Sequence, residues 1–328
     1  DATAGANVWK VSGGGSGDIS PYSYGGSDSG HILNQHGIDK LSFASGGNAT
    51  EHGNMATGIN STGRAGCSGF SSLTHAYACG GYGPGHYSPN TSDTIERYLF
   101  SAGGTMVDVG NMIIHMRDYA TSNNATHGFA QGGYRAANDP SGPAVVGYDH
   151  IQQLQFAATN NATDVANLTS ILGRPVGHSD AGNDYAYISG GNSSPQQTTI
   201  QRHSMTSASD SVNVGNLNQA SPATGTSSAT HGYGAGQYQS GTSTEIQKFA
   251  FSSSTTTSDH GDIASWSFQS TGFSSTDDGY LAGGGIPSPA TETSNIIWKY
   301  SFSSSGNSTD VGDLTVTQGY LGPNSCQV

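Results

Sequence analysis

Residues 297–302 read IWKYSF, and this short segment decides the fold because it recurs through the whole chain. Each copy begins with Ile and alternates apolar side chains with others, usually with a basic residue two positions after the Ile and an aromatic residue further on. Six copies are present, and they begin at Ile38, Ile95, Ile151, Ile200, Ile246 and Ile297. Self-similarity at a spacing of this size is typical of repeat architectures.

A second apolar residue follows each copy at a constant distance of 17 positions. These residues are Met55, Met112, Leu168, Leu217, Ile263 and Leu314. Chance would hardly supply the same offset six times. The segments therefore belong to one structural unit that has been copied along the chain.

A third element precedes most copies: an aromatic residue three positions before a pair of glycines. Tyr77 precedes Gly80 and Gly81, and Tyr280 precedes Gly283 and Gly284. The other examples are Phe129, Tyr187, Tyr233 (whose second glycine is replaced by Gln237) and, near the N-terminus, Tyr22. No such element follows Leu314. The aromatic residue with its glycine pair is therefore present near the N-terminus and missing at the C-terminus.

Each apolar segment alternates with period two over five to seven residues, and clusters of Gly, Ser and Asn separate the segments. This pattern predicts short β-strands. The leading isoleucines are 46 to 57 residues apart, which is the size of one four-stranded propeller blade. We therefore predict an all-β, six-bladed β-propeller with four-stranded antiparallel blades.

The ring is expected to close by pairing of the N- and C-terminal segments, which leaves no unpaired sheet edge inside it. We expect residues 315–322 to supply the innermost strand of the blade whose other strands contain Tyr22, Ile38 and Thr50. The predicted organisation is a lead-in segment over 1–18, a single propeller over 19–322 and a tail over 323–328.

The double glycines at 80–81, 132–133, 190–191 and 283–284, each between an aromatic strand and an Ile-led strand, resemble the signature of kelch repeats. The likeness covers the chain from about residue 19 to 322, although the Trp usual in the fourth kelch strand is replaced by Val or Met. The style of residues 307–314 is similar to repeats in structural, fibre or adhesion proteins of marine phages and bacteria. The resemblance implies a kelch-like ring and a place outside a cell or on a virion.

Composition excludes several classes of function. The chain of 328 residues carries 10 basic and 23 acidic side chains, for a formal net charge of -13. This charge opposes binding to nucleic acid, and no apolar run approaches the length of a membrane-spanning helix. Twelve histidines and scattered aspartates show no metal-ligand spacing, so we expect no cofactor and no metal. Asp108, Asp164 and Asp310 are expected to accept backbone amides in turns.

One face of the disc is the candidate binding surface, because the loop after the double glycine varies from about 8 to about 17 residues over a constant scaffold. Exposed Tyr beside Arg and Asp suits sugars and polar protein surfaces. The candidate ligand residues are Tyr82, His86, Tyr87, Arg117, Tyr119, Tyr134, Arg135, Asp139, Tyr148 and Arg174.

The function predicted from these features is a non-enzymatic recognition or adhesion module, extracellular or on a virion surface, that binds a glycan or a protein surface. The alternative is a structural assembly subunit of a virion, fibre or extracellular appendage, whose loops contact neighbouring subunits. An enzyme, either a copper-dependent oxidase or a glycosidase on a kelch-like ring, is the third hypothesis. Residues 275–279 match the start of a sialidase turn but lack its closing Trp.

Covalent features remain open. Cys67 and Cys79 fall on neighbouring strands of one predicted hairpin, so a cross-strand disulfide is expected if the register brings them together. Eight Asn-x-Ser/Thr triplets are possible N-glycosylation sites in a secreted eukaryotic protein. They begin at Asn48, Asn60, Asn90, Asn124, Asn161, Asn167, Asn192 and Asn307.

Overall fold

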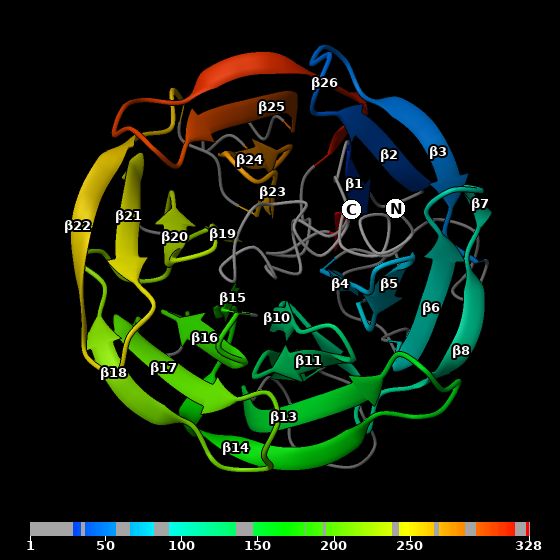
Figure 1. The fold of residues 1–328 in the computed structure, drawn as a ribbon, viewed down its shortest axis with the longest axis vertical. Coiled ribbons are helices and arrows are strands. Elements are labelled where there is room, and N and C mark those ends of the chain that lie inside the picture. Colours follow the sequence, from blue (N-terminus) through cyan, green and yellow to red (C-terminus); the bar gives the residue numbers. More distant parts are fainter. Residues whose placement is uncertain are drawn as a thin grey trace, which may run out of the picture.

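The computed structural model describes residues 29–33, 37–56, 66–81, 92–135, 147–180, 182–192, 195–237, 243–265, 269–285, 293–318 and 326–327. They form an all-β, propeller-like fold with four-stranded antiparallel blades arranged around a central axis (Figure 1). Among these residues, no helix is long and apolar enough to cross a membrane. The prediction of an all-β propeller is confirmed at this level.

Three sheets contain four strands each. They are β4 (Ser68–Ser71), β5 (His75–Cys79), β6 (Thr94–Leu99) and β8 (Val107–Asn111); β10 (Ala120–Asn123), β11 (His127–Gln131), β13 (Tyr148–Gln155) and β14 (Thr163–Leu172); and β23 (Thr271–Ser274), β24 (Asp278–Ala282), β25 (Ser294–Ser301) and β26 (Thr309–Gln318). A two-stranded sheet pairs β9 (Met116–Arg117) with β12 (Tyr134–Arg135).

An eight-stranded sheet consists of two antiparallel groups of four. The first is β15 (Val176–Asp180), β16 (Tyr185–Ser189), β17 (Thr199–Ser204) and β18 (Val212–Asn216), and the second is β19 (Thr224–Ser227), β20 (His231–Ala235), β21 (Glu245–Ala250) and β22 (Thr255–Asp262). The parallel pairing of β18 with β22 at Gly215 and Thr255 joins the two groups. Strand order within each group is the same as in the four-stranded sheets.

The remaining sheet has five strands in the order β27 (Cys326–Gln327), β1 (Ser29–Leu33), β2 (Gly37–Ser42), β3 (Thr50–Asn54) and β7 (Gly104–Thr105). The last of these comes from the next blade along the chain and pairs in parallel with β3. Neighbouring blades are therefore hydrogen-bonded to each other at the rim here, as they are between β18 and β22.

The repeat marks the core of every blade. All six leading isoleucines are at most 1% exposed, and all six residues that follow them by 17 positions are at most 7% exposed. The leading Ile lies in the third strand of its group, and the second apolar residue comes directly after the fourth strand in most of them. The periodicity of the sequence thus predicted the buried positions of the sheets correctly.

The basic residue of the repeat faces the aromatic residue of the neighbouring strand. Arg97 lies opposite Tyr77, Arg202 opposite Tyr187, and Lys248 opposite Tyr233. The Lys248 ammonium lies 5.7 Å from the centroid of the Tyr233 ring. In this pair the cation covers the face of the ring. The Arg202 guanidinium likewise lies 4.2 Å from the ring centroid of Tyr185, on the same strand as Tyr187, so the basic residue has a structural role.

Each blade has a β-bulge directly after its leading Ile, where the register against the fourth strand shifts. Opposite several of these bulges stands a glycine with positive φ, as at Gly110, whose amide donates to Asp108 Oδ1 at 3.0 Å. Gly312 and Asp310 repeat this turn. The predicted role of Asp108 and Asp310 is confirmed, whereas Asp164 pairs with His150 at 3.1 Å instead.

The side chain of the residue after the leading Ile forms hydrogen bonds with the preceding blade. Gln152 Oε1 accepts from the amide of Ile113 at 2.7 Å, and Gln201 Oε1 accepts from the amide of Thr169 at 2.8 Å. Gln247 does the same with Gln219. These amide groups are buried, so their hydrogen bonds fix the angle between adjacent sheets without leaving an unpaired polar atom.

Equivalent hydrogen bonds link the last sheet to the first. Asp39 is fully buried, and its carboxylate accepts from the amide of Thr315 at 2.9 Å and from the Thr315 hydroxyl at 2.8 Å. At the rim, Asn48 Oδ1 accepts from the amide of Asp313 at 3.1 Å. Residues distant in sequence therefore repeat the contacts that link consecutive blades.

The expected strand assignment at this junction is wrong. Residues 315–318 belong to β26, the outermost strand of its sheet, and the innermost strand next to β1 is β27, in the segment expected to be a tail. The strand equivalent to the aromatic strand is β1, with His31 opposite Lys40, and Tyr22 lies outside the described residues. The alternation pattern missed β27 because that strand has two residues, and it missed β1 because His replaces the aromatic residue.

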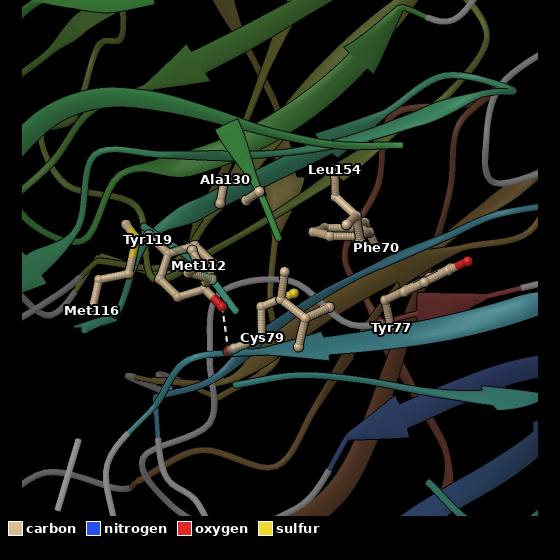
Figure 2. Packing of buried hydrophobic residues seen from close by; sticks show 10 residues of the cluster. Phe70, Tyr77, Cys79, Met112, Met116, Tyr119, Ala130 and Leu154 are labelled. Carbon is tan, nitrogen blue, oxygen red and sulfur yellow. Dashed lines mark hydrogen bonds between the residues drawn. The ribbon is translucent and has the colours of Figure 1, made fainter. Parts of the chain in front are cut away.

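Cores lie between adjacent sheets. Figure 2 shows one of them, where Phe70, Tyr77 and Cys79 of one sheet meet Ala130 and Leu154 of the next. A gap of about 10 Å³ remains in this core, which is no more than about one water molecule occupies. The interior of this core therefore holds no ligand-sized cavity.

Candidate functional site

The segments that enter the innermost strands share an unusual backbone conformation. The residue two or three positions before β4, β10, β15, β19 and β23 has a positive φ of 50° to 63°; these residues are Gly66, Asp118, Arg174, Ser221 and Gln269. The amide of Asp118 donates to the Gly66 carbonyl at 2.9 Å, and the amide of Arg174 donates to the Asp118 carbonyl at 3.0 Å. These entry segments of successive blades are thus linked beside the central axis.

Two of these residues form the charged centre of the site together with Arg117. The Asp118 side chain is 4% exposed, and its Oδ2 accepts from Arg117 Nη1 at 2.8 Å, from Arg174 Nε at 3.1 Å and from Arg174 Nη2 at 3.0 Å. One buried carboxylate therefore holds two guanidinium groups in place. Charge-assisted hydrogen bonds of this kind are stronger than neutral ones and fix orientation.

Gln269 completes the support of Arg174 from a third blade. With its amide oxygen turned towards the guanidinium, Gln269 accepts from Nη2 at 3.1 Å and from Nη1 at 3.2 Å. Gln269 itself is buried, with 5% exposed. Arg174 is therefore fixed between Asp118 and Gln269, two residues that are 151 positions apart in the sequence.

Tyr134 lies beside both arginines. It stands opposite Arg117 in the pairing of β12 with β9, and the guanidinium carbons of Arg117 and Arg174 lie 5.7 and 5.8 Å from its ring centroid. Its hydroxyl donates to the Asn192 carbonyl. Burial raises the pKa of Tyr134, and the two guanidinium groups act in the opposite direction. The phenol is therefore a neutral group, presented with two cations at its face.

Three of the predicted ligand residues, Arg117, Tyr134 and Arg174, come together in this cluster. Tyr148 is half-buried in β13, where its amide donates to the Gly133 carbonyl and its ring lies 5.5 Å from that of His150. Tyr82, His86, Tyr87 and Asp139 lie outside the described residues, and only the backbone of Arg135 is described.

Tyr119 does not fit its predicted role as a ligand residue. It is fully buried, and its hydroxyl donates to the Cys79 carbonyl inside the core of Figure 2. The prediction treated the whole entry segment as exposed. Position 119 instead points towards the preceding blade, where the large ring fills the space between two sheets.

Gln269 was missed at the sequence level. Its signal was positional: Asp118, Arg174 and Gln269 each stand two residues before the first strand of their repeat unit. An alignment of the units on their first strands, rather than on the Ile-led strands, brings the three side chains to one position. Residue type alone gave no indication, since Gln is common on surfaces.

The predicted disulfide does not form, and Cys67 and Cys79 are both thiols. In the pairing of β4 with β5, Cys79 lies opposite Ser68, so Cys67 is displaced by one residue. Successive side chains of a strand point to opposite faces. The two sulfurs accordingly lie in different cores, Cys67 with Ile38 and Met106 and Cys79 with Phe70 and Met112.

The predicted glycosylation positions differ in access. Asn48, Asn161, Asn167 and Asn307 are exposed and Asn192 is half-buried, whereas Asn60 and Asn90 lie outside the described residues. Asn124 is buried, and its Nδ2 donates to Asp184 Oδ1 at 2.9 Å. Attachment of a glycan at Nδ2 of Asn124 is incompatible with this packing. Within the described part of the chain, no group of three or more His, Cys, Asp or Glu side chains could hold a metal ion.

Comparison with known proteins bears on the fold. No family model matches the sequence, and no curated protein matches it. A solved structure described as "Structure of YjhT" is similar, with a TM-score of 0.63 and 11% sequence identity, over 87% of this chain and 97% of that chain. At this identity the likeness shows the fold alone, and it supports a propeller-like arrangement of blades.

Proposed function

We propose that this chain is a six-bladed, kelch-like ring that acts as a non-enzymatic recognition or adhesion module outside a cell or on a virion. Support for six blades comes from the six Ile-led third strands and from the order of the innermost strands. The strands β4, β10, β15, β19, β23 and β27 contact one another in sequence, and β27 contacts both β23 and β4. The double glycines carry the kelch resemblance.

The observation that carries the function is the cluster at the entry to the innermost strands. Arg117, Arg174 and Tyr134 are partly exposed, with side chains that are fixed rather than mobile, because Asp118 and Gln269 hold the arginines. A rigid aromatic ring flanked by oriented donors is the chemistry of sites that bind sugars or polar protein surfaces. Preorganisation of this kind lowers the entropic cost of binding.

The alternative of an assembly subunit has less support. The exposed large hydrophobic residues of the outer strands are Val107, Ile171, Val212 and Val316, and they lie one each on β8, β14, β18 and β26, the outer strands of four different blades around the rim in Figure 1. Single apolar residues scattered over a surface need no partner to explain them. A subunit contact would be expected to gather such residues into one patch.

A glycan array tests the proposal. We expect saturable binding of at least one glycan, and loss of at least tenfold in affinity in Tyr134→Ala. The matched control is Tyr185→Ala, because Tyr185 also lies under a guanidinium, that of Arg202, at 4.2 Å. Tyr185 is the first residue of β16 and lies at the opposite end of its blade from the entry to the innermost strand. Equal losses in both variants, or no saturable binding by the wild type, would count against the proposed site.

The enzyme hypothesis makes a different demand. A copper-dependent oxidase needs a stoichiometric metal, and a glycosidase needs turnover of a glycan that the array identifies. Metal analysis of the purified protein and product detection after overnight incubation test both. Stoichiometric copper, or sugar released from the glycan, would support the enzyme hypothesis and refute the non-enzymatic recognition module.

A further inference from the structure

We propose that the interface between the sheet of β1, β2 and β3 and the sheet of β4, β5, β6 and β8 opens in mild acid, when His31 takes up a proton. We call this interface the His31 seam. Its opening would be a conformational response to pH, and it does not depend on which ligand the proposed module binds. The reasons lie in the side chains that pack between neighbouring sheets.

Most interfaces between neighbouring repeat units share one side-chain pair. An aromatic ring of the second strand packs against the residue five positions after the leading Ile of the next unit, as Tyr77 does against Phe156 with ring centroids 5.0 Å apart. The equivalent pairs, at 4.7 to 4.9 Å, are Tyr187 with Phe251, Tyr233 with Phe302 and Tyr280 with Phe43. In the His31 seam the pair is His31 with Phe100, at 4.8 Å. An imidazole therefore stands where these interfaces have a ring that never carries a positive charge.

The surroundings of His31 oppose a positive charge on its ring. His31 is 1% exposed, its Nδ1 is hydrogen-bonded to the Tyr98 hydroxyl, and its Nε2 lies 3.2 Å from Ser29 Oγ. The ring of His52 lies 4.9 Å away, and Lys40 stands opposite His31 on β2. In other units the basic residue of the repeat faces an aromatic ring, which attracts a cation. Here the same basic residue would face a second cation.

The other ionisable groups of the His31 seam come from β3, β6 and β27. His52 Nε2 donates to the Phe100 carbonyl at 3.0 Å and so links the two sheets. Glu96 is buried on β6, two positions before Tyr98, and Cys326 stands opposite His31 in the pairing of β1 with β27. Burial lowers the pKa of His31 to about 3, and the positive charges of His52 and Lys40 act in the same direction. The closed interface therefore excludes the proton in mild acid.

The size of the effect follows from the two protonation equilibria. Opening exposes His31 to water, where a histidine titrates near 6.5. Between this pH and about 3 the open form binds a proton that the closed form excludes, so opening becomes more favourable as pH falls. These values raise the equilibrium constant for opening about 25-fold between pH 7 and pH 5. The rim keeps the two sheets joined, because β3 pairs with β7 and the Met106 amide donates to the Asn54 carbonyl at 2.8 Å.

Two features distinguish the His31 seam from the interfaces that hold other buried histidines. Two imidazoles lie in ring contact here, whereas His178 and His203 each lie against a phenylalanine. The innermost strand is also held by the shortest pairing: β27 pairs with β1 through two residues, and the innermost strands of the other five units pair through four or five. Acid should therefore open this interface before the others.

The two buried thiols can report on neighbouring interfaces in the unmodified chain. Cys67 lies in the core of the His31 seam with Ile38 and Met106. Cys79 lies in the next core along the chain, and no histidine is among the described residues that form that core. A dipyridyl disulfide reacts with thiols in acid as well as at neutral pH, and peptide mass spectrometry assigns the label to each cysteine. Each rate is divided by the rate of the same thiol in the urea-unfolded chain at the same pH.

At pH 5 we expect Cys67 to react about tenfold or more faster than Cys79, and about 25-fold faster than Cys67 itself at pH 7. His31→Phe, which restores a ring without a titrating group, should bring the two rates at pH 5 to within about threefold of each other. His31→Gln, a polar side chain that does not titrate, should do the same and serves if the first variant does not fold. His203→Gln is the matched control, because it removes a buried histidine from another interface.

Each other outcome overturns the proposal. Equal rates for Cys67 and Cys79 at pH 5 would show that acid acts on the whole chain and not on one interface. A Cys67 rate that is the same at pH 7 and pH 5, or that stays high in the His31 variants, would refute His31 as the sensor. Loss of the difference in His203→Gln would refute its assignment to the His31 seam. None of these measurements uses a glycan, so their failure and the failure of the proposed function are distinguishable.

Discussion

Acid should destabilise this protein through histidines that are buried in their neutral form. His178 is fully buried between two blades, where its Nδ1 contacts the Thr226 carbonyl at 3.0 Å and its Nε2 contacts Ser189 Oγ at 2.8 Å. Burial lowers the pKa of His178 to about 4, although the hydrogen bond to Thr226 acts in the opposite direction. Burial likewise lowers the pKa of His203 to about 4.

The sign follows from which state binds the proton. An unfolded histidine titrates near 6.5, so between pH 6.5 and 4 the unfolded chain takes up protons that the folded chain refuses. The stability contributed by neutral His178 is complete above this window and is lost as pH falls through it. At pH 5 the loss is about 2 kcal/mol for each such histidine, hence about 4 kcal/mol for His178 and His203 together.

Urea unfolding at pH 7 and at pH 5 measures this effect. We expect His178→Asn to be less stable than wild type at pH 7 and to lose about 2 kcal/mol less than wild type on going to pH 5. Ser189→Ala is the control, because it removes a hydrogen bond but keeps the titrating ring. If His178→Asn and wild type lose the same free energy of unfolding between the two pH values, the assignment of the acid sensitivity to His178 is refuted.

Two further predictions concern the junction of the ring and the spacing of its inner strands. Asp39→Ala should lower the free energy of unfolding by about 1 to 3 kcal/mol, because it removes a buried carboxylate that accepts two hydrogen bonds from Thr315, and denaturant unfolding measures this loss. No loss would show that this contact does not close the ring. Gly128→Ala should be destabilising by about 1 to 3 kcal/mol, because its new β-carbon would lie 2.3 Å from the Phe70 ring. The control Gly306→Ala, with nothing within 4 Å, should change the melting temperature little, and equal effects at both positions would contradict the packing argument.

The sequence predicted the parts of the fold that the repeat itself encodes. The leading Ile and the apolar residue 17 positions later are buried in every unit, since the same two sites of one sheet recur. The glycine pairs that mark the repeat lie at the end of the second strand, where Gly132 and Gly133 have φ values of 63° and 96°. Local pattern was sufficient wherever a residue's environment is set within its own blade.

Features that depend on register or on contacts between distant segments could not be read in the same way. A shift of one residue separates Cys67 from Cys79, and no sequence spacing reveals which face of a strand each occupies. The closing strand β27 is too short to show alternation, and its partner β1 carries His31 where other blades have an aromatic ring. Both are determined by pairing across nearly 300 positions of the chain.

The candidate site depends both on the local pattern of the repeat and on contacts between distant segments. The repeat imposes one backbone conformation at the entry to the inner strands, and glycine at position 66 shows what that conformation alone requires. Asp118, Arg174, Ser221 and Gln269 depart from that solution in four blades. Three of them act together, because the side chains of Asp118 and Gln269 both contact the Arg174 guanidinium. A left-handed backbone with a β-carbon is less stable by about 1 kcal/mol or more, so three departures that serve one contact are poorly explained by scaffold needs. Gln269→Gly separates the two explanations, because it relieves the backbone and removes the support of Arg174: a folded, equally stable variant with weakened ligand binding is expected if the side chain serves recognition, and unchanged binding would refute that role.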